Sequence, residues 1–188
     1  MNNQKNIISS EDAIELILQG QEIANYHIIG KTELYKIASK LNRELVIQDC
    51  FIEDLVSPSA EFIHGLRIVR SHLAKCSFNY AYFIGGLFIS DCTFDSYLDF
   101  EAGGHNQNDR GFQIKNSSFH GFVNFFDCWF QSAVEVVGNE FKKGTNLLGN
   151  KDKPFSVQFD SPPLIENNRG QIDLEGEGDK SINIIYLN

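Results

Sequence analysis

Several features that are scarce in this sequence exclude common classes of protein. The 188 residues hold 16 lysines and arginines against 25 aspartates and glutamates, a formal net charge of −9, which argues against binding of nucleic acid or anionic membranes through basic patches. No apolar run is long enough to span a bilayer, and the N-terminus lacks the basic start and apolar core of a secretion signal. We expect a cytoplasmic protein that contacts neither membrane nor nucleic acid directly, and whose charge favours a basic partner.

Closely spaced cysteine pairs are also missing. The four cysteines, Cys50, Cys76, Cys92 and Cys128, are far apart and form no Cys-x-x-Cys pair. Such spacing is poor for zinc and unlike a dense disulfide framework. We therefore expect reduced thiols buried as small hydrophobic groups, with no metal and no cofactor.

Phenylalanine, by contrast, occurs 16 times, while tryptophan and methionine occur once each. From Leu66 the chain divides into five-residue blocks, with one extra residue at Asp91, that usually begin with a small residue and have an apolar third residue. The blocks are LRIVR, SHLAK, CSFNY, AYFIG, GLFIS and CTFDS, with third residues Ile68, Leu73, Phe78, Phe83, Phe88 and Phe94. After a glycine-rich insertion the third residues are Ile114, Phe119, Phe125, Phe130, Val136, Phe141 and Leu147.

This spacing predicts an all-β solenoid. A five-residue block cannot bury its apolar side chain alone, but stacking successive coils about 4.8 Å apart pairs their backbones and builds a column of third residues. A helix is a poor alternative because a spacing of five drifts around a cylinder with 3.6 residues per turn. We expect the third residues to be buried and the other positions to tolerate polar residues.

The blocks resemble the pentapeptide-repeat family, in which a small residue stands two places before a central Leu or Phe. The resemblance covers roughly Leu45 to Gly149, with LVIQD, CFIED and AEFIH as further blocks. In that family each block forms one side of a square coil, so the resemblance implies a right-handed parallel β-helix. Certain members resemble the DNA duplex in shape and charge and occupy the DNA site of a type II topoisomerase.

We predict a single domain over residues 1–188, in three parts. Residues 1–44 form an N-terminal cap and irregular first coil, residues 45–149 the repeat, and residues 150–188 an irregular last coil or C-terminal cap. Within SSEDAIELILQG, Ser9 or Ser10 can cap a helix that Gly20 ends. Its apolar residues, which could cover the open end of the repeat, are Ala13, Ile14, Leu16, Ile17 and Leu18.

The C-terminal segment offers two alternatives. EGEGD predicts a turn between 172–174 and 182–187, which gives either a last coil or a terminal hairpin. The residues 182–187 are more apolar than an exposed edge strand would normally be. They either close their own coil or form a homodimer by pairing with the same segment of a second copy.

The insertion between Glu101 and Gly111 is the candidate binding site. Loops that leave a rigid scaffold often hold binding groups, and His105, Asp109 and Arg110 offer acid-base, anionic and cationic functions. The alternative is a tolerated surface insertion, because changes of loop length affect stability little. The block positions of His64, His72 and His120 predict separately exposed side chains.

These observations favour a non-catalytic binding or scaffolding module that presents a rigid surface to a protein partner. One alternative is a DNA-mimicking topoisomerase antagonist, which needs an aligned acidic face where Arg67, Arg70 and Lys75 interrupt the sequence. Another is a small carbohydrate-active β-helix enzyme, for which Asp95 and Asp99 could supply the carboxylate pair. No G-x-S-x-G, H-E-x-x-H or phosphate-binding glycine motif is present, so we expect no enzyme activity.

Overall fold

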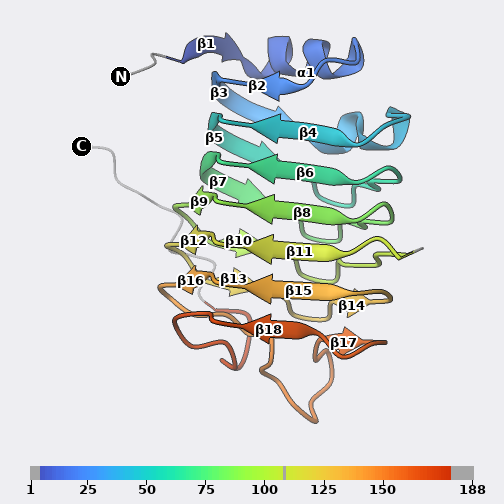
Figure 1. The fold of residues 1–188 in the computed structure, drawn as a ribbon, viewed down its shortest axis with the longest axis vertical. Helices are drawn as coiled ribbons and strands as arrows, with labels where there is room; N and C mark the ends of the chain where they lie inside the picture. The colour runs from blue at the N-terminus through green and yellow to red at the C-terminus, as the bar shows by residue number, and fades with distance from the viewer. Residues whose placement is uncertain (1–4, 108, 179–188) are drawn as a thin grey trace.

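The computed structural model describes residues 5–107 and 109–178, and strands in parallel sheets dominate them (Figure 1). The first sheet contains β1 (Asn6–Ser9), β3 (Tyr26–Glu33), β5 (Phe51–Val56), β7 (His72–Ser77), β9 (Thr93–Phe94), β10 (Leu98–Asp99), β12 (Ser118–Phe119), β13 (Val123–Asn124) and β16 (Glu140–Phe141). The second contains β2 (Ile23–Ala24), β4 (Leu45–Gln48), β6 (Leu66–Val69), β8 (Leu87–Ser90), β11 (Phe112–Lys115), β15 (Val134–Val137) and β18 (Leu164–Glu166). A short third sheet pairs β14 (Trp129–Phe130) with β17 (Gln158–Phe159). The prediction of a parallel, β-rich chain with a short N-terminal helix is confirmed.

The chain passes alternately through the two large sheets, and we call one such pass a circuit. In the second sheet Leu45 pairs with Leu66, Leu66 with Leu87, Leu87 with Phe112, and Phe112 with Val134. Figure 1 shows the strands of this sheet stacked one below another from β4 to β18. Each circuit therefore forms its backbone hydrogen bonds with the circuits before and after it, and outward side chains of equivalent positions lie in rows.

The core is a stack of the predicted third residues. All of them except Phe88 are buried. The ring of Phe119 stacks between those of Phe94 and Phe141, with centroid distances of 5.0 and 5.1 Å. Phe100 stacks in the same way on Phe78 and Phe125. Offset stacking of this kind adds to the free energy gained by burying the rings.

Phe88 was predicted to be buried, and this was wrong. Leu87 and Ile89 face the core instead, and Phe88 lies partly exposed beneath the guanidinium of Arg67. The buried positions are Phe83, Ile89 and Phe94, so the six-residue step falls between Phe83 and Ile89, one block earlier than we assigned it. Within this step Gly86 has a φ of +92°. A left-handed conformation of this kind suits glycine.

Some of the small first residues of the blocks also accept hydrogen bonds from the backbone. At one corner between the sheets, the side chain of Ser71 accepts a hydrogen bond from the Cys50 backbone N–H, and that of Ser117 accepts one from Cys92. The side chain of Asn139 likewise accepts a hydrogen bond from the Ser117 backbone N–H. These bonds satisfy buried amides where the strand ladder is interrupted, so small polar residues are favoured at this corner.

The N-terminal cap contains α1 (Ser10–Leu18), with Ser9 as its N-cap. The Ser9 hydroxyl accepts from the Asp12 N–H, and the Asp12 carboxylate accepts from the Ser9 N–H, which completes a capping box. Of the predicted apolar face, Ala13 and Ile17 are buried, whereas Leu18 is 52% exposed and does not cover the core. Strand β1 was not predicted from the sequence; it pairs with β3.

The region from 21 to 42 lies in the part expected to form the N-terminal cap and irregular first coil. It forms β2 and β3, which pair with β4 and β5, and then two 3₁₀ turns, η1 (Leu34–Lys36) and η2 (Ala38–Lys40).

The C-terminal part continues the stack through β17 and β18. Residues 172–174, expected in a last coil or a terminal hairpin, form no strand, and the Leu174 N–H donates to the Thr145 carbonyl at 3.1 Å. Residues 182–187 lie outside the described part of the chain, so their pairing remains a prediction. Within 5–107 and 109–178, no helix is long and apolar enough to cross a membrane.

Truncation of a stacked ring tests the core. We expect Phe119→Ala to lower the free energy of unfolding by about 3 to 5 kcal/mol, because the ring is fully buried between two others. Phe88→Ala is the matched control, and it should cost about 1 kcal/mol because it removes mainly the contact with Arg67. Urea unfolding of both variants measures the difference. Equal losses would contradict the assignment of inward and outward positions.

Candidate binding surface

The predicted insertion begins later than the sequence suggested. Gly104 still pairs with Tyr82 on one side and Trp129 on the other, in a narrow ladder outside the two large sheets. The chain leaves this ladder at His105, which has a φ of +56°, and re-enters the second sheet at Phe112. A side chain at position 104 would meet the Trp129 carbonyl 2.6 Å from its Cβ, so glycine is needed for this close approach.

His105 lies between two aromatic side chains. Its ring centroid is 4.0 Å from that of Tyr82 and 5.5 Å from that of Trp129. Tyr82 and Trp129 are 37% and 38% exposed, and the His105 side chain is partly buried between them. We call Tyr82, His105 and Trp129 the aromatic row.

Polar groups lie at both ends of the aromatic row. The Trp129 indole N–H donates to the Asp160 carboxylate at 2.8 Å. Glu61 pairs with Tyr82 in the ladder at the other end. Both carboxylates are on exposed residues, and neither forms an ion pair within the described part of the chain.

Burial lowers the pKa of His105 below the ordinary value of 6.5, and a hydrogen bond with the Gln131 side chain acts in the opposite direction. The folded protein therefore favours the neutral form of the imidazole in the middle of the row. This lowers the positive charge of the aromatic row between the two carboxylates.

The buried base of the insertion was not predicted. Asn106 is fully buried, and its side-chain amide donates to the carbonyls of Arg110 and Ala133, both at 3.0 Å. The first bond joins the two ends of the loop to each other, and the second ties them to the next circuit. Asn106 thereby holds the neighbouring His105 in place.

Asp109 and Arg110 lie apart from His105. They line a hollow of about 210 Å³ together with Arg67, Phe88 and Glu44, among other residues. There the Arg67 guanidinium lies 4.4 Å from the centroid of the Phe88 ring, and its Nε is 3.1 Å from a Glu44 carboxylate oxygen. The three predicted binding residues therefore do not form one site, and only His105 belongs to the aromatic row.

A histidine cluster on the first sheet contradicts another prediction. His72 and His120 were expected to be separately exposed, but both contact Asp95, at 2.6 and 3.2 Å. They meet because β7, β9 and β12 are neighbours in the parallel sheet, so outward residues of three circuits lie side by side. The same carboxylate thus holds two histidines.

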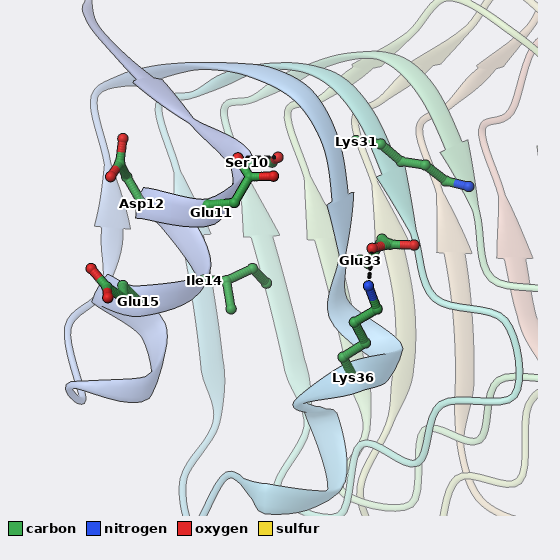
Figure 2. A pocket seen from close by; sticks show the side chains of 8 residues that line it. All are labelled: Ser10, Glu11, Asp12, Ile14, Glu15, Lys31, Glu33 and Lys36. Carbon is green, nitrogen blue, oxygen red and sulfur yellow. Dashed lines mark hydrogen bonds and ion pairs between the residues drawn. The ribbon is translucent and has the colours of Figure 1, made fainter.

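A hollow of about 380 Å³ lies between α1 and the end of β3. Figure 2 shows the side chains around it. It is lined by Ser10, Glu11, Asp12, Ile14, Glu15, Lys31, Glu33 and Lys36. Lys36 forms an ion pair with Glu33, and the Tyr35 hydroxyl donates to the same carboxylate; these bonds lower the pKa of Glu33. Asp12 is held by the capping box. Since these groups neutralise or bond each other, the hollow is a weaker candidate than the aromatic row.

All four cysteines are free and buried, as predicted. Burial raises the pKa of the Cys92 thiol to about 11 and also raises those of Cys76 and Cys128. Thiols in this state are poor nucleophiles at neutral pH. Among the residues that the structure describes, no group of three histidine, cysteine, aspartate or glutamate side chains could hold a metal ion.

No family model matches the chain, and neither a curated protein nor a solved structure shows significant similarity to it.

Sequence reasoning found His105 but missed Tyr82 and Trp129. Both occupy the second, outward position of their blocks, AYFIG and CWFQS. A large aromatic residue at an outward position was a signal that could have found them, and Trp129 is also the only tryptophan. What the sequence did not reveal is that the ring of His105, the residue that follows Gly104 in the ladder, lies between them.

The lowered pKa of His105 makes a pH dependence testable. Because the folded protein favours the neutral imidazole, its contribution to stability is fully present above the unfolded pKa near 6.5 and is lost as the pH falls below it. We expect the wild type to lose more unfolding free energy than His105→Gln between pH 7.5 and pH 5. Urea titrations of both proteins at each pH measure this, and parallel losses would show that His105 is not held neutral.

Proposed function

We propose that this protein is a non-catalytic binding module, a right-handed parallel β-helix of the pentapeptide-repeat kind, that presents the aromatic row to a protein partner. The observation that carries the proposal is that Tyr82, His105 and Trp129, from neighbouring circuits, lie ring against ring, with Tyr82 and Trp129 exposed at the surface. Tyrosine and tryptophan are enriched at the energetic centres of protein interfaces.

The support beneath the row favours a binding role. Tyr82 precedes the buried Phe83, Trp129 precedes the buried Phe130, and His105 precedes the buried Asn106. Each member of the aromatic row is thus attached to a backbone fixed by the core. A preformed surface loses little conformational entropy when a partner binds.

The DNA-mimic alternative requires a continuous acidic face. Ion pairs break such a face in at least three places, because Arg70 pairs with Asp49, Arg67 with Glu44 and Lys115 with Glu135. Surface carboxylates with a bound cation present a weaker negative potential than a row of free ones. These pairs favour the general binding module over the mimic.

The enzyme alternative requires two carboxylates placed on either side of a substrate bond. Asp95 contacts two histidines, and Asp99 accepts a hydrogen bond from the Asn124 side chain at 2.9 Å. Both candidate carboxylates therefore have structural partners. This arrangement favours a non-catalytic role.

Affinity capture with matched variants tests the proposal. We expect Tyr82→Ala and Trp129→Ala to reduce recovery of the bound partner at least tenfold, because each removes a large exposed aromatic surface. The control is Tyr35→Ala, which removes the same side chain at 38% exposure from the N-terminal cap and should leave recovery unchanged. Quantitative mass spectrometry of the captured proteins is the readout.

Circular dichroism of each variant confirms that it is folded, so that a loss of capture reports on the binding surface. A partner that binds wild type, Tyr82→Ala and Trp129→Ala equally would place the binding surface elsewhere. Turnover of an oligosaccharide by the wild type, abolished in Asp95→Asn, would replace the binding module with the enzyme alternative.

A further inference from the structure

Resting on the proposed function, we infer that the aromatic row binds arginine side chains in a basic segment of the partner. The guanidinium would lie against an aromatic ring of the row and pair with Asp160 or Glu61. The inference concerns the chemistry of the contact, and three observations support it.

The first observation is the uncompensated charge at the row. Glu61 and Asp160 are exposed at its two ends, with no ion pair in the described residues. Other surface carboxylates, such as Asp49 and Glu135, are paired with a cation of the protein itself. The carboxylates of the row are thus available to a cation from outside.

The second observation is the composition of the row between these carboxylates. The faces of Tyr and Trp rings attract cations, and tryptophan does so most strongly. His105 adds a neutral ring instead of a repelling positive charge, because its pKa lies below 6.5. Among side chains, arginine combines a planar group that stacks on rings with a fork of donors that pairs with carboxylates.

The third observation is an internal precedent. In the hollow that Asp109 and Arg110 line, Arg67 stacks over Phe88 while its Nε donates to Glu44 at 3.1 Å. The protein therefore already forms the aromatic, guanidinium and carboxylate contact with its own residues. The aromatic row has the ring and the carboxylate of such a contact, and it lacks the arginine.

The overall charge of the protein also favours binding of a basic segment. A net charge of −9 raises the local concentration of basic segments and accelerates their encounter with the surface. Such steering alone does not distinguish arginine from lysine. The distinction comes from stacking and forked pairing at the row, and it can be measured.

The test uses three ten-residue peptides in which serine alternates with arginine, lysine or citrulline. Citrulline keeps the planar shape of arginine without its charge, and lysine keeps the charge without the plane. Because Trp129 is the only tryptophan, its emission reports on the row itself, and anisotropy of labelled peptide gives the affinity. We expect the arginine peptide to bind saturably, with at least about tenfold weaker binding of the citrulline peptide and weaker binding of the lysine peptide.

Matched variants localise the effect. Asp160→Asn keeps an acceptor for the Trp129 indole while it removes the charge, and Glu61→Gln removes the other charge. Each should weaken binding of the arginine peptide several-fold, and Trp129→Ala should weaken it at least as much. Glu22→Gln removes one exposed carboxylate at the N-terminal end and should leave the affinity unchanged.

Equal binding of the arginine and citrulline peptides would overturn the inference, as would equal effects of Asp160→Asn and Glu22→Gln. Saturable quenching of Trp129 by a neutral hexasaccharide, without binding of the arginine peptide, would replace the basic segment with a glycan. If Trp129→Ala abolishes partner capture but no arginine peptide binds, the inferred chemistry fails and the proposed function stands. If the arginine peptide binds at Trp129 while partner capture does not depend on it, the proposed function fails instead.

Discussion

The structure depends on the return of a large apolar side chain to the same place in every circuit. Phe119 stacks on Phe94 and Phe141 because strands β9, β12 and β16 pair in parallel and in register. A shift of register by one residue would turn these rings to the surface. Core packing and backbone pairing therefore specify the same alignment, and together they compensate for strands that are often only two residues long.

This alignment also determines the outer surface. Residues of equivalent position on neighbouring circuits lie side by side, although they are far apart in the sequence. Tyr82 and Trp129 are brought together in this way on either side of Gly104, and His105 lies between their rings because it directly follows Gly104. The cluster of His72, Asp95 and His120 likewise joins outward residues of neighbouring circuits. A repeated scaffold thus converts scattered outward residues into contiguous chemical surfaces, whose backbone is fixed by the core beneath them.

The core and the cap could be predicted from the sequence because their signals are local. The five- and six-residue spacing identified Phe119, and the capping residues identified the helix after Ser9. Phe88 was misplaced because spacing alone cannot tell which of two successive blocks contains the extra residue of a six-residue step. The burial of Leu87 and Ile89 shows that it is the earlier block. The sequence does not reveal how residues of successive circuits are aligned. That alignment places Tyr82 and Trp129 beside His105, whereas Arg110 lies in a separate hollow.

The central claim is that the stack holds the aromatic row ready as a surface for arginine. A crystal structure of the protein with the arginine peptide, compared with the free protein, tests this most directly. The account predicts a guanidinium stacked against Trp129 or Tyr82 and paired with Asp160 or Glu61, with the rings in the same positions in both structures. A peptide seated on another face, or a row that forms only in the complex, would contradict it.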